Sequence, residues 1–130
     1  MKTRTVLFVC LHGAAKSAMA AARFQRRAGE RGIAARADFA GTKPEPEMAP
    51  RVVKELLAEG TDLRGQKPRR VTAEEARAAW RVVTFGCDLA SIAPGVPVER
   101  WDDVPAVSDG YEAARDAIAA RVETLLAECG

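Results

Sequence analysis

Short apolar runs alternate with segments of helical periodicity along this chain. Residues 5–10 form a continuous apolar run rich in β-branched and aromatic side chains, which is typical of a strand buried on both faces. Further strands are expected at residues 33–40 and 81–85. A fourth, weaker strand is expected at residues 96–101, where Pro97 lacks an N–H and therefore suits only the edge of a sheet.

Two helices are expected before the third strand begins. The first covers the Ala-rich segment that begins at Ser17, and it is predicted to be capped by Ser17 and to end near Gly29 or Gly32. Pro50 opens the second helix and Gly60 closes it, as proline favours the first position of a helix and glycine the position past its end.

Two more helices carry recognisable start signals. Thr72 followed by Glu75 forms a capping box, which predicts a short helix reaching about Ala79. Ser108 or Asp109 is expected to cap a long last helix, whose apolar residues recur at intervals of three and four: Ile118, Val122, Leu125 and Cys129. This order of strands and helices predicts an α/β fold, a four-stranded, mostly parallel sheet with helices on both faces.

Composition supports one globular domain over residues 1–130. The chain has 48% hydrophobic and 29% charged residues, close to the average for globular proteins. Its formal net charge of +2 is too small to indicate nucleic acid or a membrane surface as the main partner.

Cysteine usage and the apolar runs bear on the cellular compartment. Three cysteines are too few and odd in number for a disulfide-stapled secreted domain, so we expect free thiols in a reducing environment. The apolar run at residues 6–11 is shorter than the ~7–15 residues of a secretory signal core. A cytoplasmic protein is therefore expected.

The loop after the first strand has the composition of an anion-binding turn. In such a loop, small residues let successive backbone N–H groups point inward, and the following helix directs its positive dipole end to the same place. Lys16 adds a cation, and the Ser17 hydroxyl can donate to a neighbouring sulfur. These groups favour the thiolate form of Cys10, which would face a bound tetrahedral anion.

Two other interpretations of this loop are open. Cys10 can simply end a buried strand as a small apolar side chain. A nucleotide-binding P-loop, which also ends in Lys-Ser, is disfavoured because Ala15 and Cys10 occupy its two required glycine positions.

Several motifs in order along the chain resemble one family. Residues 6–20 run from Val-Leu-Phe-Val-Cys to Ser-Ala-Met-Ala, residues 39–42 read Phe-Ala-Gly-Thr, residues 82–87 read Val-Val-Thr-Phe-Gly-Cys, and residues 101–105 read Trp-Asp-Asp-Val-Pro. The set resembles the low-molecular-weight protein tyrosine phosphatases and the arsenate reductases that share their fold, whose signature is Cys-x5-Arg-Ser/Thr.

The resemblance implies roles for individual residues. Cys10 would be the nucleophile, Ser17 its hydrogen-bond partner, and Asp103 the acid that protonates the leaving oxygen, with Asp102 as its neighbour in an uncertain register. The oxyanion would be held by the loop residues Leu11, His12, Gly13, Ala14, Ala15 and Lys16.

Two positions depart from the family pattern. Lys16 replaces the signature arginine, and it offers a compact charge where arginine offers a planar fork for two oxygens. Gly13 replaces the usual asparagine, and it can adopt the left-handed conformation that such an asparagine often takes.

Cys87 follows the third strand as Cys10 follows the first, and parallel strands bring both thiols to one edge of the sheet. In the resembling arsenate reductases, a cysteine here attacks the arsenic-bound first cysteine and forms a disulfide; alternatively, Cys87 only packs at a strand end. The third cysteine of thioredoxin-coupled reductases is Pro94 here. Cys129 could replace it only if the last helix ends near the site, and its place on the apolar stripe favours packing or fraying instead.

The leading hypothesis is therefore an arsenate reductase without a bound cofactor, which takes electrons from an external thiol reductant, thioredoxin or a small-molecule thiol. The oxyanion partner would be arsenate, phosphate or sulfate. No metal is expected, because one histidine and scattered cysteines give no ligand spacing. The alternatives are a low-molecular-weight phosphotyrosine phosphatase and an oxyanion-binding relative without turnover.

Overall fold

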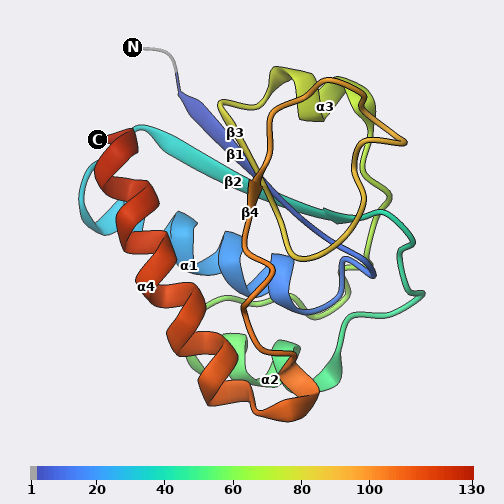
Figure 1. The fold of residues 1–130 in the computed structure, drawn as a ribbon. Coiled ribbons are helices and arrows are strands. Elements are labelled where there is room, and N and C mark those ends of the chain that lie inside the picture. Colours follow the sequence, from blue (N-terminus) through green and yellow to red (C-terminus); the bar gives the residue numbers. More distant parts are fainter. Residues whose placement is uncertain (1–2) are drawn as a thin grey trace.

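A computed structural model describes residues 3–130 of the chain. Its four strands pair in parallel in the order β2-β1-β3-β4 (Figure 1). The elements in chain order are β1 (Arg4–Cys10), α1 (Lys16–Glu30), β2 (Ala35–Gly41), α2 (Pro50–Ala58), α3 (Ala73–Ala78), β3 (Arg81–Thr84), β4 (Glu99–Arg100), a 3₁₀ turn (Val107–Asp109) and α4 (Tyr111–Cys129). The predicted α/β fold class is confirmed.

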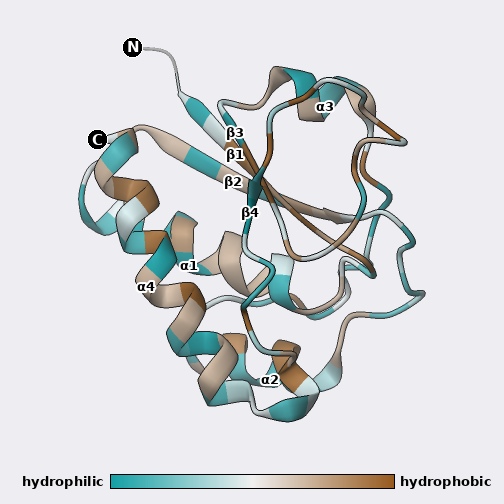
Figure 2. Cartoon of the chain, viewed as in Figure 1, coloured by the Kyte–Doolittle hydropathy of each residue, from teal (hydrophilic) through white to brown (hydrophobic). Residues whose placement is uncertain are grey.

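The central strand β1 divides the core into two parts. Val6, Phe8 and Cys10 face the helices α1, α2 and α4, whereas Leu7 and Val9 face α3 and the loop after β3. Side chains of a strand alternate between faces, so a continuous apolar run is required when both faces are covered. Figure 2 accordingly shows hydrophobic ribbon along the middle of β1 and hydrophilic ribbon in the loop after β2.

Local sequence signals place two helices correctly. Pro50 is the first residue of α2, where its missing N–H leaves no intrahelical bond unmade. The Thr72 side chain accepts from the Glu75 N–H, and the Glu75 carboxylate accepts from the Thr72 N–H, so the predicted capping box begins α3.

The predicted caps of the other two helices are wrong. α1 begins at Lys16, two residues earlier than a cap at Ser17 would require, and the Ser17 side chain is fully buried. Gly110 precedes α4, while Ser108 and Asp109 lie in the 3₁₀ turn before it. Neither α1 nor α4 begins with a hydrogen bond from a capping side chain.

The fourth strand is much shorter than the predicted range 96–101. Only Glu99 and Arg100 pair with β3, because the proline at position 97 cannot donate to a ladder and the chain turns away after Trp101. The pairing of this edge is completed by the Trp101 N–H, which donates to the Thr84 carbonyl. Among residues 3–130, no helix is long and apolar enough to cross a membrane.

Candidate active site

Cys10 ends β1 and is held by two hydrogen-bonding groups. Its Sγ lies 3.0 Å from the Ser17 Oγ and 3.2 Å from the backbone nitrogen of Gly13. Ser17 reaches the sulfur because it lies in the first turn of α1, directly after the loop that leaves β1. The Gly13 N–H donates to this sulfur, and in the Ser17 contact either the hydroxyl or the thiol can be the donor.

The backbone of the loop at residues 11–15 is turned so that its carbonyl groups face away from the sulfur. The segment after β2 donates N–H groups to them, in the pairs Thr42 to Cys10, Lys43 to Leu11, Glu45 to His12 and Ala49 to Ala14. In the chain from residue 3 onward, the N–H groups of Leu11, His12, Ala14 and Ala15 have no acceptor within the protein. With the amino end of α1, these donors form an anion cradle.

Gly13 makes this turn possible by adopting a φ of 62°, in the left-handed region. Its backbone packs directly on Gly41, the last residue of β2. The motif at residues 39–42 was recognised from its sequence without a physical reason for Gly41. The close backbone contact with Gly13 supplies that reason, because a side chain at position 41 would collide with Gly13.

Lys16 extends toward the loop after β4. Its Nζ donates to the Val104 carbonyl at 3.2 Å and lies 5.8 Å from the centre of the Phe85 ring. Phe85 in turn packs edge-on against Trp101, with ring centres 5.6 Å apart. Lys16 therefore joins the start of α1 to the acidic loop, a role that sequence reasoning missed because 88 residues separate it from Val104.

The two aspartates of that loop each pair with an arginine. The Asp103 carboxylate contacts the Arg121 guanidinium of α4, and Arg121 also lies over the Trp101 ring. Asp102 accepts from Arg100 at 2.8 Å. Asp103 directly precedes Val104, whose carbonyl accepts from Lys16, but the Asp103 carboxylate is held by Arg121 of α4.

Cys87 follows Gly86, whose φ of 78° turns the chain sharply after β3. The Cys87 thiol is half-buried and donates to the Val9 carbonyl at 3.5 Å. Val9 and Cys10 are adjacent, so the two cysteines share the carboxyl edge of the sheet. Burial raises the pKa of the Cys87 thiol, and negative charge on Cys10 raises it further.

A model of the low molecular weight phosphotyrosine protein phosphatase family matches residues 5–129. This chain belongs to that family.

Individual known proteins are similar to this chain in sequence or in fold. A "Putative arsenate reductase" of Halobacterium salinarum is 32% identical to this chain over 131 residues, covering 93% of this chain and 89% of that protein. The thioredoxin-dependent arsenate reductase Cg_ArsC1' of Corynebacterium glutamicum superposes with a TM-score of 0.81 at 27% identity, over 98% of this chain and 62% of its own. YfkJ of Bacillus subtilis shares the fold, with a TM-score of 0.83 at 24% identity over 98% and 95% of the two chains.

Leu11 and His12 lie at the exposed outer side of the cradle. The His12 Nε2 lies 3.5 Å from the Glu45 carboxylate, and half of the His12 side chain is exposed. Leu11 is 44% exposed. Their backbones belong to the cradle, while their side chains face outward.

Cys129 lies at the opposite end of the sheet from Cys10. Its carbonyl accepts from the Arg4 guanidinium at 3.0 Å, and Arg4 is the first residue of the strand that Cys10 ends. A strand of this length spans roughly 20 Å. Cys129 therefore cannot replace the missing third cysteine, and its predicted packing role is consistent with its burial.

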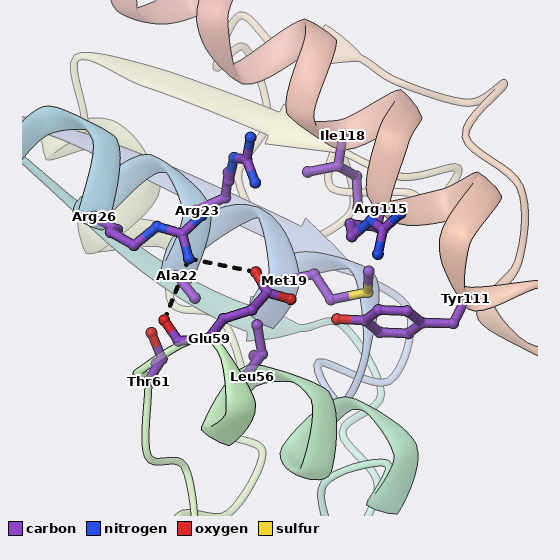
Figure 3. Close-up of a pocket in the computed structure, with 10 residues that line it drawn as sticks. All are labelled: Met19, Ala22, Arg23, Arg26, Leu56, Glu59, Thr61, Tyr111, Arg115 and Ile118. Carbon is purple, nitrogen blue, oxygen red and sulfur yellow. Dashed lines mark hydrogen bonds and ion pairs between the residues drawn. The ribbon is translucent and has the colours of Figure 1, made fainter.

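A small cavity between α1, α2 and α4 is separate from the cradle, because none of its lining residues belongs to the loop after β1 (Figure 3). The Tyr111 hydroxyl points into it, and Arg26 pairs with Glu59 at its wall. In the described part of the chain this hydroxyl is buried without a hydrogen-bond partner. Burial and the nearby negative charge of Glu59 raise the pKa of Tyr111 to about 12.

Proposed function

We propose that this protein is an arsenate reductase that uses Cys10 as nucleophile and Cys87 as resolving thiol. The observation that carries the proposal is the placement of two free thiols at one edge of the sheet, with an anion cradle around the first. A phosphatase of the same fold needs only the first thiol, because water can resolve its phosphocysteine. The 32% identical relative named as an arsenate reductase is consistent with this choice.

In the first step, arsenate binds to the inward N–H groups of residues 11–16 and to Lys16. The Cys10 thiolate attacks arsenic, and one arsenate oxygen leaves as water after taking up protons. Asp103 donates a proton to that oxygen in this scheme, which requires its carboxyl to separate from Arg121. Arsenic remains in its +5 state because a sulfur has replaced an oxygen.

In the second step, the Cys87 thiolate attacks the Cys10 Sγ. The electron pair of the sulfur–arsenic bond moves to arsenic, which leaves as arsenite in the +3 state. The two sulfurs lose the two electrons that arsenic gains, and they end as a Cys10–Cys87 disulfide. An external thiol, from thioredoxin or a small molecule, then reduces this disulfide.

Arsenate reduction and aryl-phosphate hydrolysis measured side by side test the proposal. Wild-type protein given arsenate without reductant is expected to lose two hydrogens in mass and to yield a Cys10–Cys87 cross-linked peptide. Cys87→Ser is expected to react once with arsenate and then stop, whereas Cys129→Ser, the matched control, turns over normally. Full turnover by Cys87→Ser with thioredoxin as the sole reductant would refute the internal relay.

A phosphatase would behave differently in the same experiment. Aryl-phosphate hydrolysis that survives Cys87→Ser, without arsenate reduction by the wild type, would identify that activity instead. Phosphate binding without either activity would identify an oxyanion-binding protein.

A further inference from the structure

A cavity of about 310 Å³ opens beside Cys87, on the side of the loop that follows β3. Its wall is formed by residues 84–100, including Leu89, Ala90, Ala93 and Val98. Its volume is at the lower end of the ~300–1,000 Å³ typical of small-molecule sites. Cys10 is absent from the wall, so the cavity meets only one of the two thiols.

The two sulfurs pack on different parts of the core. Cys10 belongs to the cluster under α1 and α4 and is 6% exposed, whereas Cys87 packs against the cluster that contains Val9, Leu89 and Ala93. A molecule in the cavity therefore reaches Cys87 from the side away from Cys10. Attack on a disulfide sulfur proceeds opposite the departing sulfur, so this approach suits a thiol that displaces Cys10.

The surroundings of Cys10 also favour attack on Cys87 with Cys10 as the leaving thiolate. The displaced sulfur leaves as a thiolate, and the Gly13 N–H and Ser17 hydroxyl are in place to stabilise it. A better-stabilised leaving thiolate makes exchange faster. Attack on Cys10 would instead release Cys87, whose half-buried thiol lies against the Val9 carbonyl. Burial raises the pKa of that thiol, which makes Cys87 the poorer leaving group.

Resting on the proposed function, we propose that the cavity binds a low-molecular-weight thiol of about tripeptide size, which attacks the Sγ of Cys87 in the Cys10–Cys87 disulfide. The attack breaks that disulfide, releases the Cys10 thiolate and leaves Cys87 in a mixed disulfide with the small thiol. A second molecule of the same thiol attacks the mixed disulfide. Two small thiols are thereby oxidised to one small disulfide, and both protein thiols return to the reduced state.

The test begins with a Cys10–Cys87 disulfide made with diamide, a general thiol oxidant, so that it does not depend on arsenate chemistry. The oxidised protein receives limiting glutathione as the probe thiol, is quenched with iodoacetamide and is mapped by peptide mass. Glutathione is expected on Cys87 and the iodoacetamide label on Cys10. Glutathione found mainly on Cys10, or no disulfide after diamide, would overturn the inference.

Pocket variants test the cavity itself. Ala90→Phe introduces an aromatic ring at its wall and is expected to slow reduction by glutathione about tenfold, because the ring occupies the space beside Cys87. Ala127→Phe, at an exposed position of α4, is the matched control and leaves the rate unchanged. If Ala90→Phe leaves the glutathione rate unchanged while thioredoxin reduces both proteins rapidly, a protein dithiol is the partner and the small-thiol site is refuted.

The inference and the proposed function can fail separately. Glutathione on Cys87 in a protein that does not reduce arsenate would retain the thiol site and remove the arsenate reductase activity. Arsenate turnover by a protein that takes glutathione on Cys10 would retain the arsenate reductase activity and remove the thiol site at Cys87.

Discussion

Gly13 and Gly41 pack backbone against backbone: a Cβ on Gly41 would stand 2.6 Å from the Gly13 nitrogen, and a Cβ on Gly13 would stand 2.7 Å from the Gly41 nitrogen. The contact joins the turn around Cys10 to the end of β2. The neighbouring N–H groups of Thr42 and Lys43 donate to the Cys10 and Leu11 carbonyls, so the same two segments are also joined by hydrogen bonds.

Gly41→Ala should therefore disturb the cradle more than an ordinary strand substitution. We expect a loss of about 1–3 kcal/mol in the free energy of unfolding and a clear weakening of phosphate binding. Gly29→Ala is the control, because that helical glycine has open space around it and should gain ~0.5–1 kcal/mol. Chemical denaturation and calorimetry measure both effects, and unchanged phosphate affinity in Gly41→Ala would argue against this role.

Ser17→Ala removes the hydroxyl that contacts the Cys10 sulfur. We expect alkylation of Cys10 by iodoacetamide at neutral pH to slow by about tenfold, since hydrogen bonds to charged groups contribute ~1.5–3 kcal/mol. Peptide mass analysis follows the rate at Cys10 alone. Ser91→Ala changes an exposed serine outside the site and should have no effect; equal rates in all three proteins would contradict a role for Ser17.

Lys16→Arg restores a planar fork for two oxyanion oxygens at the start of α1. We expect phosphate and arsenate to bind roughly tenfold more tightly, because bidentate charged hydrogen bonds are stronger than those of a single ammonium. Lys16→Met should bind both anions more weakly than the wild type. Calorimetric titration measures the dissociation constants of both anions. Weaker binding by Lys16→Arg would mean that the loop, through the contacts of Lys16 with Val104 and Phe85, fits lysine and not the larger arginine.

The resolving step should depend on pH through Cys87. Burial raises the pKa of this thiol above its ordinary value, so at neutral pH only a small fraction is the nucleophilic thiolate. After arsenate addition, formation of the Cys10–Cys87 disulfide is expected to accelerate by about tenfold for each pH unit between pH 6 and 8. Quenched-flow mass analysis measures this rate, and a rate independent of pH would exclude Cys87 deprotonation as its control.

Tyr111 provides a separate test of the packing between α1, α2 and α4. It is the only tyrosine, so absorbance at about 295 nm follows its ionisation directly. Its pKa is raised to about 12, so the folded protein should show no tyrosinate signal near pH 10, where the unfolded chain ionises. The contribution of the neutral Tyr111 hydroxyl to the free energy of unfolding is fully present below pH ~10, and it is lost as the pH rises through the pKa of the folded protein. A native titration midpoint near 10 would show that the hydroxyl is hydrated.

The sequence by itself determined the order of the elements and the composition of the cradle. The run at residues 5–10, the capping box at Thr72 and the proline at position 50 act over a few residues, so their patterns can be read directly. The loop between Cys10 and Ser17 could also be recognised, because its small residues and its place between a strand and a helix are local features. Parallel pairing then predicted that Cys87 shares an edge with Cys10.

Only the tertiary structure decided which side chains meet. Ser17, which the sequence predicted both as a partner of the Cys10 sulfur and as a helix cap, makes only the first contact, Lys16 contacts Val104, and the Asp103 carboxylate pairs with Arg121. The last two contacts join segments far apart in the chain, and their geometry depends on how α1 and α4 pack on the sheet. No periodicity in the sequence encodes such an angle, because packing is set by the combined shapes of many buried side chains.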